Sequence, residues 1–200
     1  MQKAASDPRA CRGAVKPVWE VQRVAVASAN MNRQKGTDPA PREPAFTETL
    51  QIGIVVRDLD ATMRSYVDNY GIGPWDIVEF NPGNLKDFHE HGKRVGRSWR
   101  LASTMIGRVQ WELIEPLDDE SVYARFLAEK GEGVHHIALA PSNFDEAVAA
   151  QAERGNELVL SGTFSGYRVA YLATDRDLGV IAEIFSPPAD ADATPDAISP

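Results

Sequence analysis

The sequence predicts an α+β protein built from two copies of a strand–helix–strand–strand–strand module. The first observation is an internal repeat, in which residues 50–61 align without gaps with residues 135–146. The second is that residues 109–116 align in the same way with residues 180–187. The third is that each half contains an apolar strand, a capped helix and three further extended segments.

The first half is expected to begin with a strand and a short amphipathic helix. Its expected elements are a strand at 50–56, a helix from Asp58 or Asp60 to about Asn69, an extended segment at 75–80, a loop at 81–96, and strands at 98–105 and 108–114. An aspartate before an apolar stripe is a common helix N-cap. Gly71 and Pro74 favour the end of that helix. The polar, glycine-containing composition of residues 81–96 indicates the loop.

The second half is expected to repeat this order. Its expected elements are a strand at 136–140, a helix at about 144–154, and strands at 157–161, 168–174 and 180–185. The two modules span about 47–117 and 133–188, with a linker helix at 122–130, and together form a domain at 46–188. Residues 1–45 and the acidic residues 189–200 are expected to be disordered tails, because their composition cannot build an apolar core.

Composition excludes several classes of partner. Hydrophobic residues make up 43% of the chain, which is ordinary for a globular protein, and the formal charge is −8. That charge argues against nucleic acid, whose phosphates need a basic surface. No apolar run reaches the length of a membrane span. The single cysteine, Cys11, fits a reducing compartment, so we expect a cytoplasmic protein.

Four strands each place one polar residue on a face that is otherwise apolar or small. The side chains of a strand alternate between its two faces, which puts Gln51, Glu112, His136 and Glu183 on such faces. A buried carboxylate is costly unless it is paired or binds a metal. The set therefore predicts a divalent-metal site. Taken singly, His136 can also be a hydrogen-bonded core residue, and Gln51 can cap a strand edge.

The repeat and its motifs resemble the vicinal oxygen chelate superfamily, which includes glyoxalase I and methylmalonyl-CoA epimerase. The motifs are Gln-Ile-Gly-Ile-Val-Val-Arg-Asp-Leu-Asp from residue 51, Glu-Leu-Ile-Glu-Pro-Leu from residue 112, and Gly-Val-His-His-Ile-Ala-Leu from residue 133. The resemblance covers about residues 47–188. It implies that the paired βαβββ modules form a curved open sheet around a metal-binding cleft.

The resemblance also implies a ligand set and a catalytic role. The family's four metal ligands fall on Gln51, Glu112, His136 and Glu183. Epimerases usually have histidine at the position of Gln51, whereas the human type of glyoxalase I has the set found here. One nitrogen and three oxygen donors suit Zn, Ni, Co or Mn. By resemblance to glyoxalase I, Glu183 is expected to be the catalytic base, with Glu112 as the alternative.

Aromatic and basic residues near the predicted site are candidates for substrate binding. We expect Trp75, Trp99 and Phe185 to line a pocket, although several of the chain's aromatics must be core residues. A basic cluster that includes Arg94, Arg97 and Arg100 suits an anionic substrate, and is equally well explained as a charged, solvated strand edge. His89 and His91 are either a loop lid or solvated loop residues.

Three functional hypotheses remain from the sequence. The first is a metal-dependent isomerase, epimerase or lyase that stabilises an enolate of a carbonyl or acyl-thioester substrate. The second is a non-catalytic protein that sequesters a hydrophobic small molecule in the same cleft. The third, an Fe(II) dioxygenase, is disfavoured because Gln51 replaces the second histidine of that site. We also expect a homodimer.

Overall fold

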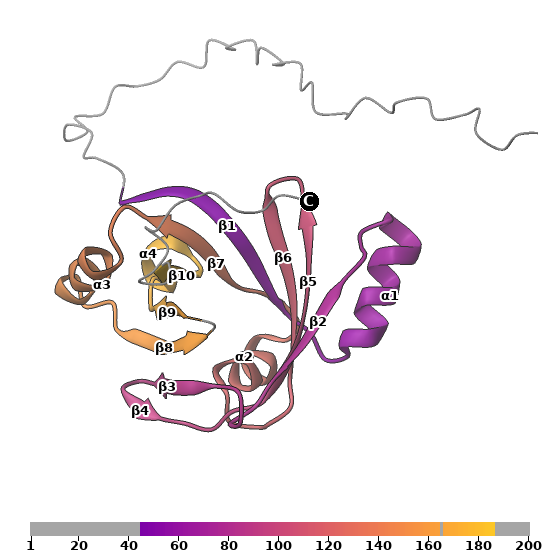
Figure 1. Cartoon of the computed structure of the whole chain (residues 1–200), viewed down its shortest axis with the longest axis horizontal. Coiled ribbons are helices and arrows are strands. Elements are labelled where there is room, and N and C mark those ends of the chain that lie inside the picture. Colours follow the sequence, from indigo (N-terminus) through magenta and orange to yellow (C-terminus); the bar gives the residue numbers. More distant parts are fainter. Residues whose placement is uncertain (1–44, 165, 187–200) are drawn as a thin grey trace, which may run out of the picture. The chain divides into compact units, whose positions relative to one another are not determined.

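The computed structural model describes residues 45–164 and 166–186. These residues form one mixed sheet and four helices (Figure 1). The ten strands follow the order β2-β5-β6-β1-β7-β10-β9-β8-β3-β4. The sheet is curled and open, as the sequence predicts. The expectations for residues 1–44 and 187–200 lie outside the described residues.

The elements of the first half extend from β1 to β6. They are β1 (Phe46–Val55), α1 (Leu59–Tyr70), β2 (Asp76–Phe80), β3 (Lys86–Glu90), β4 (Lys93–Arg94), β5 (Trp99–Ile106) and β6 (Val109–Pro116). Asp58 is the N-cap of α1, since its side chain accepts a hydrogen bond from the Ala61 amide at 2.8 Å. Gly71 ends the helix in the left-handed conformation, at φ 65°.

The elements of the second half extend from α2 to β10. They are α2 (Val122–Lys130), β7 (Gly133–Pro141), α3 (Phe144–Glu153), β8 (Leu158–Phe164), β9 (Tyr167–Leu172), α4 (Asp175–Leu178) and β10 (Ile181–Ser186). The short helix α4 was not predicted. The predicted strand at 168–174 ends two residues early, at Leu172, and the Thr174 hydroxyl hydrogen-bonds to the Val180 carbonyl and the Ala182 amide, each at 2.8 Å.

The two halves meet along the middle of the sheet. β1 pairs in parallel with β6, and β7 pairs in parallel with β10, so the first and last strands of each half are neighbours. β1 and β7 then pair antiparallel with each other. The helices α1 and α3 cover one face of the sheet, α1 against β5 and β6 and α3 against β9 and β10. The other face carries the largest apolar cluster, which includes Trp99, Tyr123 and Tyr171.

The prediction of a loop at residues 81–96 is wrong. Residues 86–94 form the β3–β4 hairpin, and β3 pairs with β8 of the second half. Phe88 is 7% exposed and Glu90 is 5% exposed, so the hairpin has a buried face in spite of its polar composition. The first half therefore contributes a strand to the far edge of the sheet, next to the second half.

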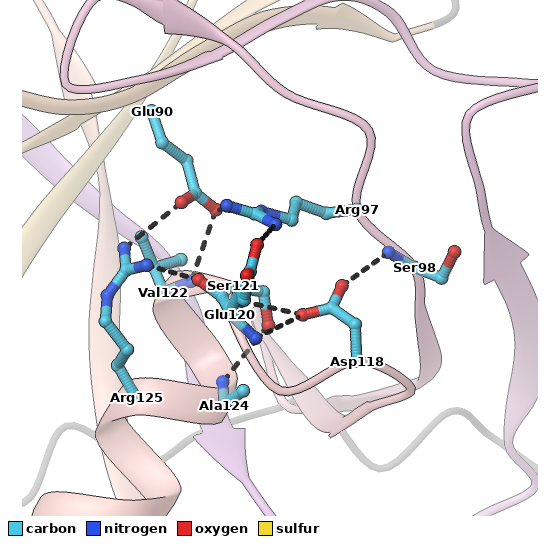
Figure 2. A network of polar contacts seen from close by, with 9 residues as sticks. All are labelled: Glu90, Arg97, Ser98, Asp118, Glu120, Ser121, Val122, Ala124 and Arg125. Atoms are coloured by element: carbon cyan, nitrogen blue, oxygen red, sulfur yellow. Dashed lines mark hydrogen bonds and ion pairs between the residues drawn. The ribbon is translucent and has the colours of Figure 1, made fainter.

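A polar network fixes this hairpin to the start of α2 (Figure 2). Glu90 accepts a hydrogen bond from the Val122 amide at 3.2 Å and forms ion pairs with Arg125 at 3.1 Å and Arg97 at 3.7 Å. Arg97 also pairs with Glu120 at 2.6 Å. A carboxylate at a helix N-terminus is favourable because it faces unpaired amides. The buried charge of Glu90 is thus compensated from three sides.

We predict that Glu90→Ala lowers the free energy of unfolding by about 2–4 kcal/mol, because it leaves a helix amide and two guanidinium groups without their shared acceptor. Urea titration followed by circular dichroism measures the change. Glu129→Ala is the matched control, since Glu129 lies exposed on the same helix and its replacement should cost less than about 0.5 kcal/mol. Equal losses in the two variants would contradict a specific role for Glu90.

Candidate functional site

The register of the four central strands brings the predicted ligand positions together. In one row across the sheet, Gly53 of β1 lies between Glu112 of β6 and His136 of β7. In the neighbouring row, Ala138 of β7 lies between Gln51 of β1 and Glu183 of β10. The four polar residues therefore occupy adjacent strands of a single chain, two from each half.

The imidazole of His136 fits only because its cross-strand neighbour is a glycine. His136 is fully buried. A Cβ atom at position 53 would lie 2.0 Å from Cε1 and 2.2 Å from Nε2 of that ring, far inside the contact distance. Gly53 thus provides the space in which the ring lies against the sheet.

The polar atoms of the four side chains face one another. His136 Nε2 lies 3.1 Å from Glu183 Oε2 and 3.8 Å from Glu112 Oε2. Gln51 Nε2 donates to Glu112 Oε1 at 2.7 Å and also to the side-chain oxygen of Gln110. The remaining amide oxygen of Gln51 is buried and has no hydrogen-bond partner among the described residues.

Two tyrosines and a second histidine support His136. The Tyr171 hydroxyl lies 3.4 Å from His136 Nε2 and 2.9 Å from the Tyr123 hydroxyl. The ring of His135 contacts Phe126 and Tyr123 of α2 and also lies beside Tyr171. Its Nδ1 lies 3.1 Å from His136 Nδ1. The sequence alone did not indicate these roles for Tyr123 and Tyr171, because nothing in their local pattern marks them.

The electrostatics of the site favour a charged His136 and a neutral His135. Burial lowers the pKa of His136, but attraction to Glu183 and hydrogen bonds to Glu112 and Glu183 outweigh burial and raise it to about 9. Burial lowers the pKa of His135 well below its usual value. A neutral His135 can accept the Nδ1 proton of His136, which leaves Nε2 directed at the two carboxylates.

The carboxylate of Glu183 is also strongly affected by its surroundings. Burial raises the pKa of Glu183, and the neighbouring His136 opposes that rise. Glu183 is 4% exposed and lines the cavity described below. A desolvated carboxylate of this kind is a stronger base than one in water.

The site lies in the wall of a cavity of about 740 Å³. Most of the lining side chains are aromatic or aliphatic, and the polar ones include Gln51, Ser103, Gln110, Glu112 and Glu183. The volume is within the range of small-molecule sites. Its lining comes from both halves and from the β3–β4 hairpin.

The predicted substrate-binding residues divide into two groups. Trp99 and Phe185 line the cavity, whereas Trp75, Arg94, Arg97 and Arg100 do not. Trp75 packs against Tyr66 of α1, at a ring separation of 5.5 Å. The alternation of residues along the strands gives no information on the side chains that Trp75 and the three arginines contact from elsewhere in the chain.

The three arginines of the predicted basic cluster are engaged elsewhere. Arg100 binds Asp60 and Glu115, each at 3.1 Å. Arg97 belongs to the network of Figure 2, and the exposed Arg94 lies 4.0 Å from Asp87. Of the two histidines in question, His89 lies in β3 and binds the Asp87 carbonyl at 2.7 Å, and His91 is exposed in the turn of the hairpin.

Comparison with known proteins identifies the family. The Glyoxalase/Bleomycin resistance protein/Dioxygenase superfamily profile matches residues 50–171. The chain belongs to this superfamily. The vicinal oxygen chelate resemblance seen in the sequence is thereby confirmed.

Relatives of known structure include methylmalonyl-CoA epimerases. A Streptomyces coelicolor methylmalonyl-CoA epimerase in complex with 2-nitronate-propionyl-CoA is 25% identical, with a TM-score of 0.53 over 70% of this chain and 96% of that chain. The Mycobacterium tuberculosis epimerase shares the fold at 23% identity and a TM-score of 0.54, over 77% of this chain and 97% of that one. A Bacillus subtilis protein of uncharacterised function, YqjC, is 33% identical over 94 residues, which span 45% of this chain and 66% of that protein.

The donor set of this superfamily member fits a divalent cation. Zn²⁺ lies about 2.0–2.2 Å from nitrogen and oxygen donors, so donors that share it lie roughly 3–4 Å apart. The His136–Glu183 and His136–Glu112 separations of 3.1 and 3.8 Å fall in that range. Among the described residues, no three histidine, cysteine or acidic side chains are grouped so that they could hold an ion as they stand. Glu112 instead faces Gln51, and Glu183 faces His136. The orphaned Gln51 oxygen supplies a further donor.

No helix in the described part of the chain is long and apolar enough to cross a membrane.

We predict that Gly53→Ala destabilises the protein by about 2–3 kcal/mol and abolishes stoichiometric metal binding, because the new methyl group overlaps the His136 ring. Denaturant unfolding and metal analysis measure the two effects. A double-mutant cycle with His136→Ala tests the cause. In the absence of the ring, Gly53→Ala should cost less than about 1 kcal/mol. Additive losses would show that the glycine serves the backbone and not the ring.

We predict that the metal-free protein loses stability as pH rises from about 6.5 to about 9. The folded state then binds one proton more than the unfolded state, so the stabilisation is complete below pH 6.5 and lost above pH 9. The expected loss is on the order of 3 kcal/mol. Urea titrations across this range, with the His136 ring followed by NMR, measure it. Metal-loaded protein should lack this slope, because binding displaces the Nε2 proton. A flat or rising profile in the metal-free protein would contradict the prediction.

Proposed function

We propose that the protein is a metal-dependent isomerase or epimerase that removes the proton next to the carbonyl of a ketone or acyl thioester and stabilises the resulting enolate. The observation that carries this proposal is the convergence of two carboxylates, an imidazole and an amide at the wall of an apolar cavity. The similarity to methylmalonyl-CoA epimerases supports the same reaction class.

Gln51, Glu112, His136 and Glu183 are the residues that would hold the metal. A divalent cation bound there, Zn, Ni, Co or Mn, supplies Lewis-acid polarisation of a substrate carbonyl. His135 fixes the orientation of the His136 ring through the Nδ1 contact at 3.1 Å. Gly53 fixes the depth of that ring in the sheet.

Glu183 is the proposed base. Its carboxylate is buried, faces the cavity and has a raised pKa, which suits removal of a weakly acidic carbon-bound proton. Glu112 lines the same cavity and lies on the other side of His136. An isomerase needs only Glu183 to move the proton, whereas an epimerase needs a second group to deliver it to the opposite face. That second role is the one we propose for Glu112, which would leave the metal to take it.

The apolar lining excludes water from the reacting carbon. A low-dielectric surrounding strengthens every charge interaction in the site, so that proton exchange with solvent passes through the carboxylate of Glu183. Tyr171 lies within reach of His136 and can donate a hydrogen bond beside the carboxylates.

A second candidate function is sequestration of a hydrophobic compound without chemistry. The size of the cavity and its predominantly aromatic and aliphatic lining favour it. This function requires neither a metal nor Glu183. A homodimeric state and a cytoplasmic location stay predictions.

The test is exchange of the carbon-bound proton with D₂O in a panel of acyl thioesters and hemithioacetals, measured by NMR with metal-loaded protein. We expect exchange with the wild type and a loss of roughly 10²–10⁴-fold in Glu183→Gln, because that change removes the base. Arg94→Ala is the control and should retain the wild-type rate within about twofold, since Arg94 is exposed and outside the cavity. Absence of exchange throughout the panel, with ligands still bound, would favour sequestration.

A further inference from the structure

We infer that the group held in the cavity is uncharged and apolar, an aromatic or branched aliphatic acyl group, and that a substrate with a free carboxylate there is disfavoured. This inference rests on the proposed function and names its substrate class. It separates this chain from the epimerases it resembles, since methylmalonyl-CoA carries a carboxylate on the reacting acyl group.

The charges around the cavity argue against an anionic group. Glu112 and Glu183 line it, and among the described lining residues Arg108 is the single cationic side chain. Arg108 is 87% exposed at its side chain and already pairs with Glu48 at 2.8 Å. A carboxylate deep in the cavity would face two acidic side chains, and the buried cation beside them, His136, is already paired with both.

The arginines that might have bound an anion are occupied outside the cavity. Arg97 pairs with Glu120 and Glu90, and its exposed fraction is only 18% (Figure 2). Arg100 is held between Asp60 and Glu115. Their acidic partners hold these side chains away from the cavity, so reorienting either one would leave buried or half-buried carboxylates unpaired.

The walls of the cavity are suited to rings and branched chains. Phe80 stacks on Trp99 at a ring separation of 5.0 Å and contacts Phe164 at 4.8 Å. Tyr123, Tyr171 and Phe185 extend the aromatic surface toward Glu183. Each methylene group buried here should improve binding about fourfold.

The β3–β4 hairpin supplies one wall of its own. Leu85 and Phe88 line the cavity from this segment. Phe88 packs so closely on β8 that a Cβ atom at Gly162 would lie 2.2 Å from its ring. The ring also contacts Trp99 at 5.5 Å. Since the Glu90 network holds the hairpin against α2, this wall is rigid, and it should set which acyl groups fit.

The experiment compares matched thioesters with the metal-loaded full-length protein. Methylmalonyl-CoA, 2-methylbutanoyl-CoA and 2-phenylpropanoyl-CoA differ in whether the α-substituent is a carboxylate, an ethyl group or a ring. Exchange of the α-proton in D₂O gives kcat/KM for each. We expect both uncharged substrates to exceed methylmalonyl-CoA by at least about tenfold. A preference for methylmalonyl-CoA would overturn the inference while leaving the proposed function in place.

A pair of variants tests the hairpin wall. Phe88→Ala should raise KM for 2-phenylpropanoyl-CoA about tenfold with a smaller change in kcat, because it removes a wall and leaves the reacting groups in place. Phe144→Ala is the matched control, since Phe144 lies on α3 beside Arg168 and does not line this cavity. An equal rise in KM in both variants would contradict the assignment of Phe88.

Direct binding separates this inference from the proposed function. Calorimetry of the wild type, with and without Zn²⁺, compares 2-phenylpropanamide with the analogue in which a carboxylate replaces its methyl group. Tighter binding of the uncharged amide without Zn²⁺ supports the substrate class even if no thioester exchanges its proton, an outcome that would refute only the proposed reaction. Tighter binding of the carboxylate would refute the substrate class.

Discussion

The close packing of His136 against Gly53 is the constraint on which the site depends. The two residues face each other across the pairing of β1 with β7, which is also the seam between the halves of the molecule. With the ring in that position, its Nε2 atom faces a carboxylate from each half. Any larger residue at position 53 would move the ring and with it the only nitrogen donor of the predicted set. A backbone position that carries no chemistry thus decides whether the chemistry is possible.

The remainder of the structure keeps this polar cluster in an apolar surrounding. The concave face of the sheet presents aromatic rings, and the β3–β4 hairpin adds Leu85 and Phe88 to them. Several charged groups outside the cavity form ion pairs with each other, as in the network around Glu90. Acidic groups in the cavity therefore interact strongly with each other and with whatever binds beside them, since little water screens them.

Much of the architecture can be predicted from the sequence because the sequence contains an internal repeat. The aligned strands at residues 50–61 and 135–146 give the modules, and strand alternation then places Gln51 and His136 on the same side of the sheet. The β3–β4 hairpin could not be predicted from the sequence, because its polar residues are typical of a solvated loop. Only the contact of Glu90 with the N-terminus of α2 shows that one of them is buried. The ion pairs of the three arginines did not follow from the sequence for the same reason. Their partners Asp60, Glu115 and Glu120 are distant in the chain, and periodicity carries no information on such contacts.

The pairing of β3 with β8 makes the repeat unequal. β3 lies early in the chain but can pair only after β8 of the later half has been synthesised. The edge of β1 that pairs with β7 is likewise unpaired until β7 has been synthesised. During translation the first half must therefore remain an incomplete sheet with open edges, the state in which nascent chains aggregate most readily. The two halves of the sheet thus depend on each other for their strand pairing, despite the repeat in their sequences.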